Sequence, residues 1–305
     1  MDDAETLRQE AVASQTAREK LLREKVAGEK PGAEVPAIVG PTAKETRDNL
    51  EDMGRANIKE IAPLREEQRE LEREMRIAHR HLDDLPLGTE GREEWNQRAV
   101  ELFDQHHESL LKSNAMERNQ RQRMREQLYV NKPAQFKDTE YMTLRLTPKG
   151  KEDMRLGVTE FRKLVGTGTV DDASVTISID KGSGRASAEW DGKQINLTTS
   201  SGTKTTIHEL GHWLEFNDSE VQAKALAFYD ARTPGEKAEW LGDDYDEREV
   251  TRRDKFLDPY MGKDYQRRST EIVSMGMEYY WDNPAHFARQ DPEYFDFIFD
   301  LLRGR

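Results

Sequence analysis

A change in sequence pattern near residue 135 is the strongest constraint on how this chain can fold. Before it, the chain is dense in Glu, Arg, Lys, Gln and Ala, which favour helices. After it, β-branched residues, glycine and aromatic residues occur in short alternating runs, which are typical of strands. We therefore expect an α+β protein with a charged helical arm over residues 1–135 and an α+β domain over residues 136–305.

The arm is expected to begin with a charged helix over residues 4–27 and a linker containing Pro and Gly over residues 28–43. A coiled-coil seam follows, because apolar positions then alternate at spacings of three and four. Its members are Ile61, Leu64, Gln68, Leu71, Met75, Ala78 and Leu82.

A second long helix is predicted from about Arg92 to Leu128, after a loop over Asp83–Gly91. Its apolar side is expected to consist of Trp95, Ala99, Leu102, Phe103, Leu110 and Leu111. Such an arm fits two roles: it can mediate homo-oligomerisation or docking on a larger particle, or it can be a hairpin packed on its own domain.

The C-terminal part is expected to combine a small sheet with helices. Strands are predicted at Tyr141–Thr147 and Ser174–Asp180, and a hairpin is predicted around Asp191-Gly192, with Arg185–Trp190 and Lys193–Thr198 as its strands. Helices are predicted over residues 151–165, around residues 208–212, and over residues 218–232, 268–282 and 292–303.

The segment His208-Glu209-Leu210-Gly211-His212 carries the clearest chemistry. Two histidines four residues apart project from one face of a helix and can occupy adjacent corners of a tetrahedral zinc site. Glu209 lies beside them and can reach a water without binding the metal. A glycine inside a helix is costly, so Gly211 indicates a close packing contact. We predict one divalent metal ion here, zinc by preference.

A catalytic zinc usually has three protein ligands. Glu271 is the preferred third ligand, because a carboxylate in the otherwise apolar predicted helix Ser269–Trp281 needs a partner. Asp218 is one alternative, since it stands at the third-ligand position of a longer H-E-x-x-H pattern, although Glu215 replaces the glycine of that pattern. The other alternative is a loop carboxylate, Asp243 or Asp244.

Other polar and aromatic residues have weaker interpretations. Tyr260 or Tyr265 could donate a hydrogen bond to an oxyanion, with a packed or surface tyrosine as the competing interpretation for each. His286 is interpreted as structural, and the pairs His79/His81 and His106/His107 as solvated. The expected core aromatic residues are Trp213, Tyr279, Tyr280 and Trp281.

Composition narrows the function classes. The net charge of −13 argues against general binding of nucleic acid or anionic membranes. The chain contains no cysteine, which excludes disulfides, thiolate nucleophiles and cysteine-ligated zinc. The acidic N-terminus and the lack of a long apolar run predict neither a signal peptide nor a transmembrane helix. We expect a cytoplasmic protein. If the chain assembles into a particle, the expected locations are the cytoplasm of a host cell and the virion.

The segment Thr206–Glu215 resembles the active-site helix of zincin metallopeptidases. With a glutamate on a later helix as the third ligand, the chain resembles the gluzincin branch of that group. The segments Asp258–Tyr265, Thr270–Gly276 and Asp291–Phe295 are similar to the zincin-like domain of bacteriophage structural or head-associated proteins. The resemblance covers roughly residues 140–305.

This resemblance implies that His208, His212 and Glu271 bind one zinc ion and that Glu209 is the general base. It also implies an edge strand that aligns an extended peptide substrate, either Arg185–Trp190 or Lys193–Thr198. The chain departs from compact gluzincins in the long separation between His212 and Glu271. The intervening segment 233–267 must fold away from the site or cover it.

The expected function is therefore hydrolysis of peptide bonds by a zinc metallopeptidase acting on a protein or peptide. One alternative is a phage structural or assembly protein of the minor head type, whose metal site only stabilises the domain. Another is a peptidase toxin or effector with an N-terminal delivery arm.

Overall fold

The computed structural model describes residues 40–305, apart from residues 142, 144–145, 167, 169 and 180–183. Residues 42–305 form one compact unit, an α+β structure that is mostly helical. The helix expected over residues 4–27 lies outside the described residues. Within the described part, no helix is both long enough and apolar enough to cross a membrane.

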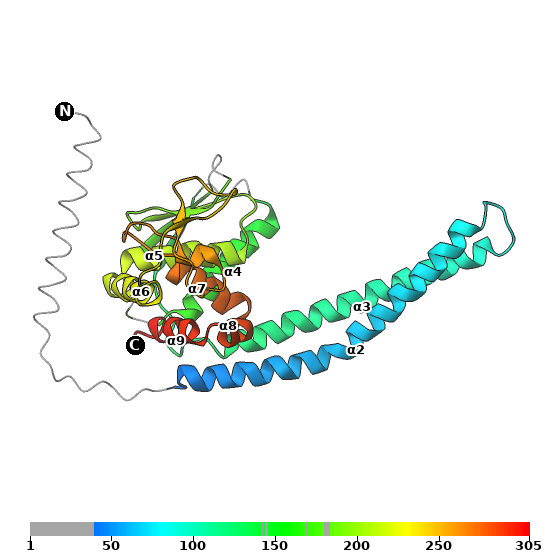
Figure 1. Cartoon of the computed structure of the whole chain (residues 1–305), viewed down its shortest axis with the longest axis horizontal. Coiled ribbons are helices and arrows are strands. Elements are labelled where there is room, and N and C mark those ends of the chain that lie inside the picture. The colour runs from blue at the N-terminus through cyan, green and yellow to red at the C-terminus, as the bar shows by residue number, and fades with distance from the viewer. Residues whose placement is uncertain (1–39, 142, 144–145, 167, 169, 180–183) are drawn as a thin grey trace, which may run out of the picture. The chain divides into compact units, whose positions relative to one another are not determined.

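Two long helices, α2 (Ala43–Asp84) and α3 (Arg92–Glu126), lie side by side as a hairpin (Figure 1). A capping box begins α2, because the Thr42 hydroxyl accepts from the Glu45 N–H and the Glu45 carboxylate accepts from the Thr42 N–H. The predicted seam of α2 is confirmed: Ile61, Leu71 and Ala78 are buried, and the other members are half-buried.

The predicted apolar side of α3 is only partly right. Trp95, Ala99 and Leu102 pack against α2, whereas Phe103, Leu110 and Leu111 are exposed, by 58%, 37% and 56%. The helix carries two neighbouring apolar stripes, and residue spacing alone does not say which of them faces a partner helix.

The base of the hairpin belongs to the core of the globular body. Ala43 and Leu50 of α2 and Met124 of α3 are buried in the same hydrophobic core as the body helices. Arg47 makes a bidentate salt bridge to Asp296, at 2.6 and 3.0 Å. These contacts attach the arm rigidly to the body at one end.

The body contains a four-stranded sheet with the order β1-β2-β4-β3. Strands β1 (Lys137–Tyr141), β2 (Ser174–Ile179) and β4 (Gln194–Leu197) are parallel, and β3 (Ser187–Ala188) pairs antiparallel with β4 at the edge of the sheet. The predicted hairpin is confirmed, with Gly192 at a φ of 69° in its turn.

The strand expected at Tyr141–Thr147 was wrong in the part that the structure describes, while residues 142, 144 and 145 lie outside the described residues. The strand ends at Tyr141, where the prediction began. Thr147 instead caps helix α4 (Pro148–Leu164), since its hydroxyl accepts a hydrogen bond from the Gly150 N–H at 3.0 Å. A threonine followed by proline is a strong helix start, and this local preference overrides the alternating pattern.

Helix α5 (Thr203–Asn217) lies at the centre of the body, between α4 and α7 (Ile272–Asp282). It buries Ile207, Leu210, Trp213 and Leu214. The remaining elements are α6 (Ser219–Arg232), the short pair β5 (Glu239–Trp240) and β6 (Val250–Thr251), the 3-10 helix η2 (Pro259–Gly262), α8 (Pro284–Gln290) and α9 (Pro292–Leu301). Because α5 is packed on both sides, its histidines are held by a rigid scaffold.

Candidate metal centre

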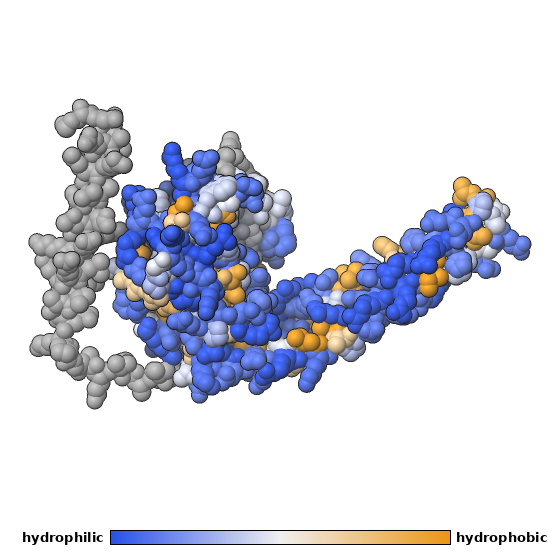
Figure 2. All heavy atoms as spheres, viewed as in Figure 1, coloured by the Kyte–Doolittle hydropathy of each residue, from blue (hydrophilic) through white to orange (hydrophobic). Residues whose placement is uncertain are grey.

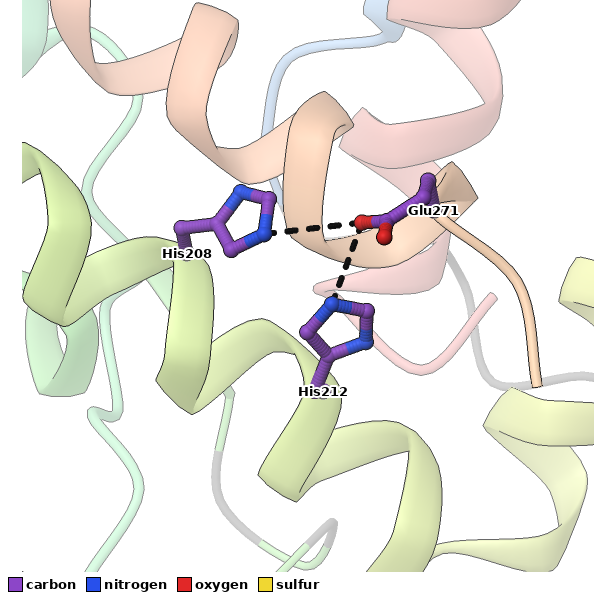
Figure 3. A group of neighbouring side chains, drawn as sticks. All are labelled: His208, His212 and Glu271. Atoms are coloured by element: carbon purple, nitrogen blue, oxygen red, sulfur yellow. Dashed lines mark ion pairs between the residues drawn. The ribbon is translucent and has the colours of Figure 1, made fainter. Parts of the chain in front are cut away.

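Helix α5 places both histidines of the motif on one face, and their Nε2 atoms point toward the same carboxylate (Figure 3). The side chains of His208 and His212 are 13% and 11% exposed, so each is largely buried but reachable. The four-residue spacing produces this arrangement because one turn of helix separates the two side chains.

Glu271 supplies that carboxylate from outside α5. Its Oε2 lies 3.0 Å from His212 Nε2 and 3.5 Å from His208 Nε2. The three ligand atoms all lie within 4.8 Å of one another, close enough to hold a metal ion. Two imidazoles and one carboxylate at this spacing are suited to holding one divalent metal ion.

The alternative third ligands lie elsewhere. Asp218 caps helix α6, where its carboxylate accepts from the N–H groups of Glu220 and Val221 at 2.9 and 3.2 Å. Asp243 and Asp244 are exposed in the loop between β5 and β6.

Glu271 is fully buried and precedes the first residue of α7, so the helix expected to include it begins at Ile272 instead. Burial opposes ionisation of Glu271, but the neighbouring imidazoles outweigh this and hold the pKa of its carboxyl well below the ordinary value. The same pairing raises the pKa of His212 to about 9, although burial alone would lower it.

A second carboxylate, Glu278 of α7, fixes the orientation of His208. The Nδ1–H of His208 donates to Glu278 Oε2 at 3.0 Å, and Lys204 Nζ lies 2.7 Å from Glu278 Oε1. This contact leaves the Nε2 lone pair of His208 available for a metal ion. His212 has no such carboxylate, and its buried Nδ1 has no hydrogen-bond partner among the described residues.

A third carboxylate, Glu215, positions the segment that carries Glu271. It lies one turn after His212, is 1% exposed, and accepts hydrogen bonds from the N–H and hydroxyl of Thr270 and from the hydroxyl of Ser269. Sequence reasoning noted Glu215 only as a departure from a longer motif. Burial raises the pKa of Glu215 to about 7.

Gly211 allows α5 and α7 to approach each other. A Cβ at this position would lie 2.7 Å from Ser274 Cα and 3.1 Å from Ser274 N, closer than two such atoms can pack. The predicted packing role of Gly211 is therefore confirmed. This close approach brings the start of α7, and with it Glu271, against the two histidines.

A cavity of about 320 Å³ is lined by His208, His212 and Glu271. Glu209 lines it beside His208 and is 4% exposed. Burial raises the pKa of the Glu209 carboxyl above its ordinary value. Ser187 and Ala188 of the edge strand β3 line the same cavity. Arg185–Trp190 is therefore the hairpin segment at the cavity, and Lys193–Thr198 is inside the sheet.

The long segment between α6 and α7 forms another wall of this cavity. Glu249, Tyr260, Lys263 and Tyr265 all line it. The Tyr265 hydroxyl donates to Glu271 Oε1 at 2.5 Å, and the Tyr260 hydroxyl accepts from Arg185 at 3.2 Å. The segment 233–267 therefore covers one side of the site, and both tyrosines are at the cavity.

The other histidines lie apart from this group. His79, His81 and His107 are exposed on the hairpin, whereas His106 is half-buried beside Glu72, contrary to the solvated position that we predicted. His286 is in the first turn of α8. Among the expected core aromatic residues, Trp213, Tyr280 and Trp281 are buried, and Tyr279 is half-buried.

Comparisons with protein-family models, curated proteins and solved structures give no significant match.

Proposed function

We propose that this chain is a zinc-dependent peptidase that hydrolyses peptide bonds in protein or peptide substrates. The carrying observation is that His208, His212 and Glu271 converge within 4.8 Å and share one cavity with the Glu209 carboxylate. Two imidazoles and one carboxylate are a ligand set of catalytic zinc, which keeps a position open for water or substrate.

Zinc held by such ligands would acidify a water molecule and polarise the carbonyl of the scissile bond. Glu209 would take the proton from the attacking water and pass it to the leaving amine. Its burial suits this role, because a raised pKa brings a general base nearer to the working pH. Tyr260 lies at the cavity wall, where its hydroxyl could donate to a developing oxyanion. The Tyr265 hydroxyl lies at the same wall but already donates to Glu271, so it would have to leave that partner to act in this way.

The position of the edge strand β3 favours a peptide as the substrate. Within the described sheet it pairs only with β4, and its residues line the cavity. An extended peptide can add to such an edge through main-chain hydrogen bonds, which align it without requiring a particular sequence.

A second candidate is a structural metal site in an assembly protein. The three ligands join α5 to a residue that follows the long segment 233–267, so a bound ion would also stabilise this connection. In that case the protein would need its ligands but not Glu209.

The decisive experiment compares wild type with Glu209→Gln, using Glu220→Gln as a control on the exposed face of α6. Metal content and cleavage of a mixed peptide library are measured on each protein. We expect one zinc per chain in all three, and a loss of cleavage of about 100-fold or more only in Glu209→Gln. Zinc binding without cleavage by any of them would contradict the peptidase and favour the structural candidate.

A further inference from the structure

The outward-facing side of α3 carries a stripe of large apolar residues. Val100, Phe103, Leu110 and Leu111 are 56%, 58%, 37% and 56% exposed. His107 lies between them and stacks parallel to Phe103, with ring centroids 6.4 Å apart. We call these five residues the outer face of α3. Its spacing of three and four residues is that of a surface packed by another helix.

This outer face is separate from the contact that holds the hairpin together. The stripe facing α2 contains Trp95, Ala99 and Leu102, which are already packed. Figure 2 shows hydrophobic patches along the projecting hairpin, surrounded by hydrophilic residues. Exposed apolar side chains that recur at helical spacing on one face, rather than scattered singly, mark a protein contact.

The charges on α3 indicate what covers this face. Glu93 and Glu94 are exposed at its N-terminal end, and Arg118 and Arg121 are exposed beyond the other end of the stripe. At 3.6 residues per turn, Glu93, Arg118 and Arg121 lie in line with the outer face of α3. Glu94 points about 120° away from Val100, so this face is acidic at one end through Glu93 and basic at the other. A second copy in antiparallel orientation matches both ends at once, whereas a parallel copy would place the acidic ends together.

We propose that two copies of this chain associate through the outer faces of α3, packed antiparallel. A pairing centred near residue 105 places Val100 of one copy opposite Leu110 of the other. It also places Arg118 of one copy one residue, about 1.5 Å along the helix axis, from the position opposite Glu93 of the other copy, and Arg121 about 6 Å from that position. The apolar contact is small, so the expected dissociation constant is micromolar rather than nanomolar.

The first test is the oligomeric state of the full chain by sedimentation velocity between about 1 and 300 µM. We expect a concentration-dependent dimer in wild type and a monomer in Phe103→Glu/Leu110→Glu. The matched control is Ile58→Glu/Ile77→Glu, which changes two exposed isoleucines of α2 by the same charge and should still dimerise. Circular dichroism melts check that both variants are folded.

A wild-type chain that stays monomeric throughout this range would overturn the proposal. So would a control variant that loses the dimer to the same extent as Phe103→Glu/Leu110→Glu. Neither outcome bears on the peptidase, whose cavity lies in the body.

The second test maps the orientation, since the chain contains no cysteine and any engineered thiol is unique. A mixture of Val100→Cys and Leu110→Cys chains should form a mixed disulfide under mild oxidation. Val100→Cys alone should not cross-link efficiently, because antiparallel packing separates its two copies by about 15 Å. Efficient cross-linking of Val100→Cys with itself, or none in the mixture, would overturn the antiparallel arrangement.

Discussion

The carboxylate of Glu215 accepts a 2.8 Å hydrogen bond from the backbone N–H of Thr270, and this contact joins the helix of the two histidines to the residue that precedes Glu271. The hydroxyls of Thr270 and Ser269 donate to the same carboxylate at 3.0 and 3.2 Å. Glu271 is therefore positioned by α5 itself, although it lies far from α5 along the chain.

Glu215→Ala is expected to weaken zinc binding by about 10-fold or more, because it removes an acceptor from three buried donors and frees the backbone before Glu271. Glu215→Gln keeps one acceptor oxygen and should lose less. Competition with a chromophoric chelator measures the affinity, with Glu220→Ala as the exposed control. Equal zinc affinity in wild type and Glu215→Ala would show that Glu215 does not position the ligand.

Glu278→Ala is expected to lower zinc affinity by about 10- to 100-fold, because His208 loses the acceptor that fixes its ring and tautomer. Asp282→Ala is the matched control, since Asp282 also pairs with Lys204, at 3.7 Å, whereas no hydrogen bond or ion pair joins it to His208 among the described residues. The same chelator competition separates the two variants. The idea fails if both reduce the affinity equally.

The features of this site that depend on neighbouring residues in the chain can be predicted from the sequence, but the contacts between residues far apart in the chain cannot. The spacing of His208 and His212 fixes their shared helix face, and a carboxylate in an apolar run pointed to Glu271. Glu215 and Glu278 were missed as supporting residues because their partners lie 55 and 70 residues away. Glu215 did carry a weak signal, since it follows Trp213-Leu214 and is flanked by Phe216 in an otherwise apolar stretch.

In the fold, too, local patterns were predictable and contacts between distant segments were not. The seam of α2 was predictable because a pattern of three and four residues encodes one buried face. The two apolar stripes of α3 could not be ranked, since their burial depends on which helix lies alongside. The predicted strand began at Tyr141, where the real strand ends. Its position depends on a tertiary contact, the pairing of Tyr141 with Ser178 of β2, whereas the helix cap at Thr147 is a local feature.

Gly211→Ala is expected to destabilise the fold by about 1–3 kcal/mol and to weaken zinc binding, because the added methyl group would force α5 away from the Ser274 backbone. Gly54→Ala in α2 is the control: its Cβ would meet Ala285 Cβ at an ordinary 3.5 Å, so the change should be neutral or stabilising. Chemical denaturation of both variants without metal measures the difference. A Gly211→Ala protein as stable as Gly54→Ala would remove the packing argument.

Glu160 of α4 links three parts of the body through one buried carboxylate. It accepts from the Tyr129 hydroxyl at 2.6 Å and from Trp281 Nε1 at 3.2 Å, and it pairs with Lys163 at 2.8 Å. Burial raises its pKa, but the hydrogen bonds from Lys163 and Tyr129 outweigh burial and keep the pKa below the ordinary value of 4.5.

Because the folded pKa of Glu160 is lowered, its stabilising contribution is present above pH 4.5 and is lost as the pH falls below that value. Glu160→Gln should therefore be less stable than wild type at pH 7, by about 1–3 kcal/mol, since a charged acceptor becomes neutral. The difference should shrink as the pH falls from 5 to 3, about the range where the carboxyl of the unfolded chain takes up its proton. Urea unfolding of both proteins across this range measures the effect. A constant difference at every pH would mean that the titration of Glu160 contributes nothing to acid sensitivity.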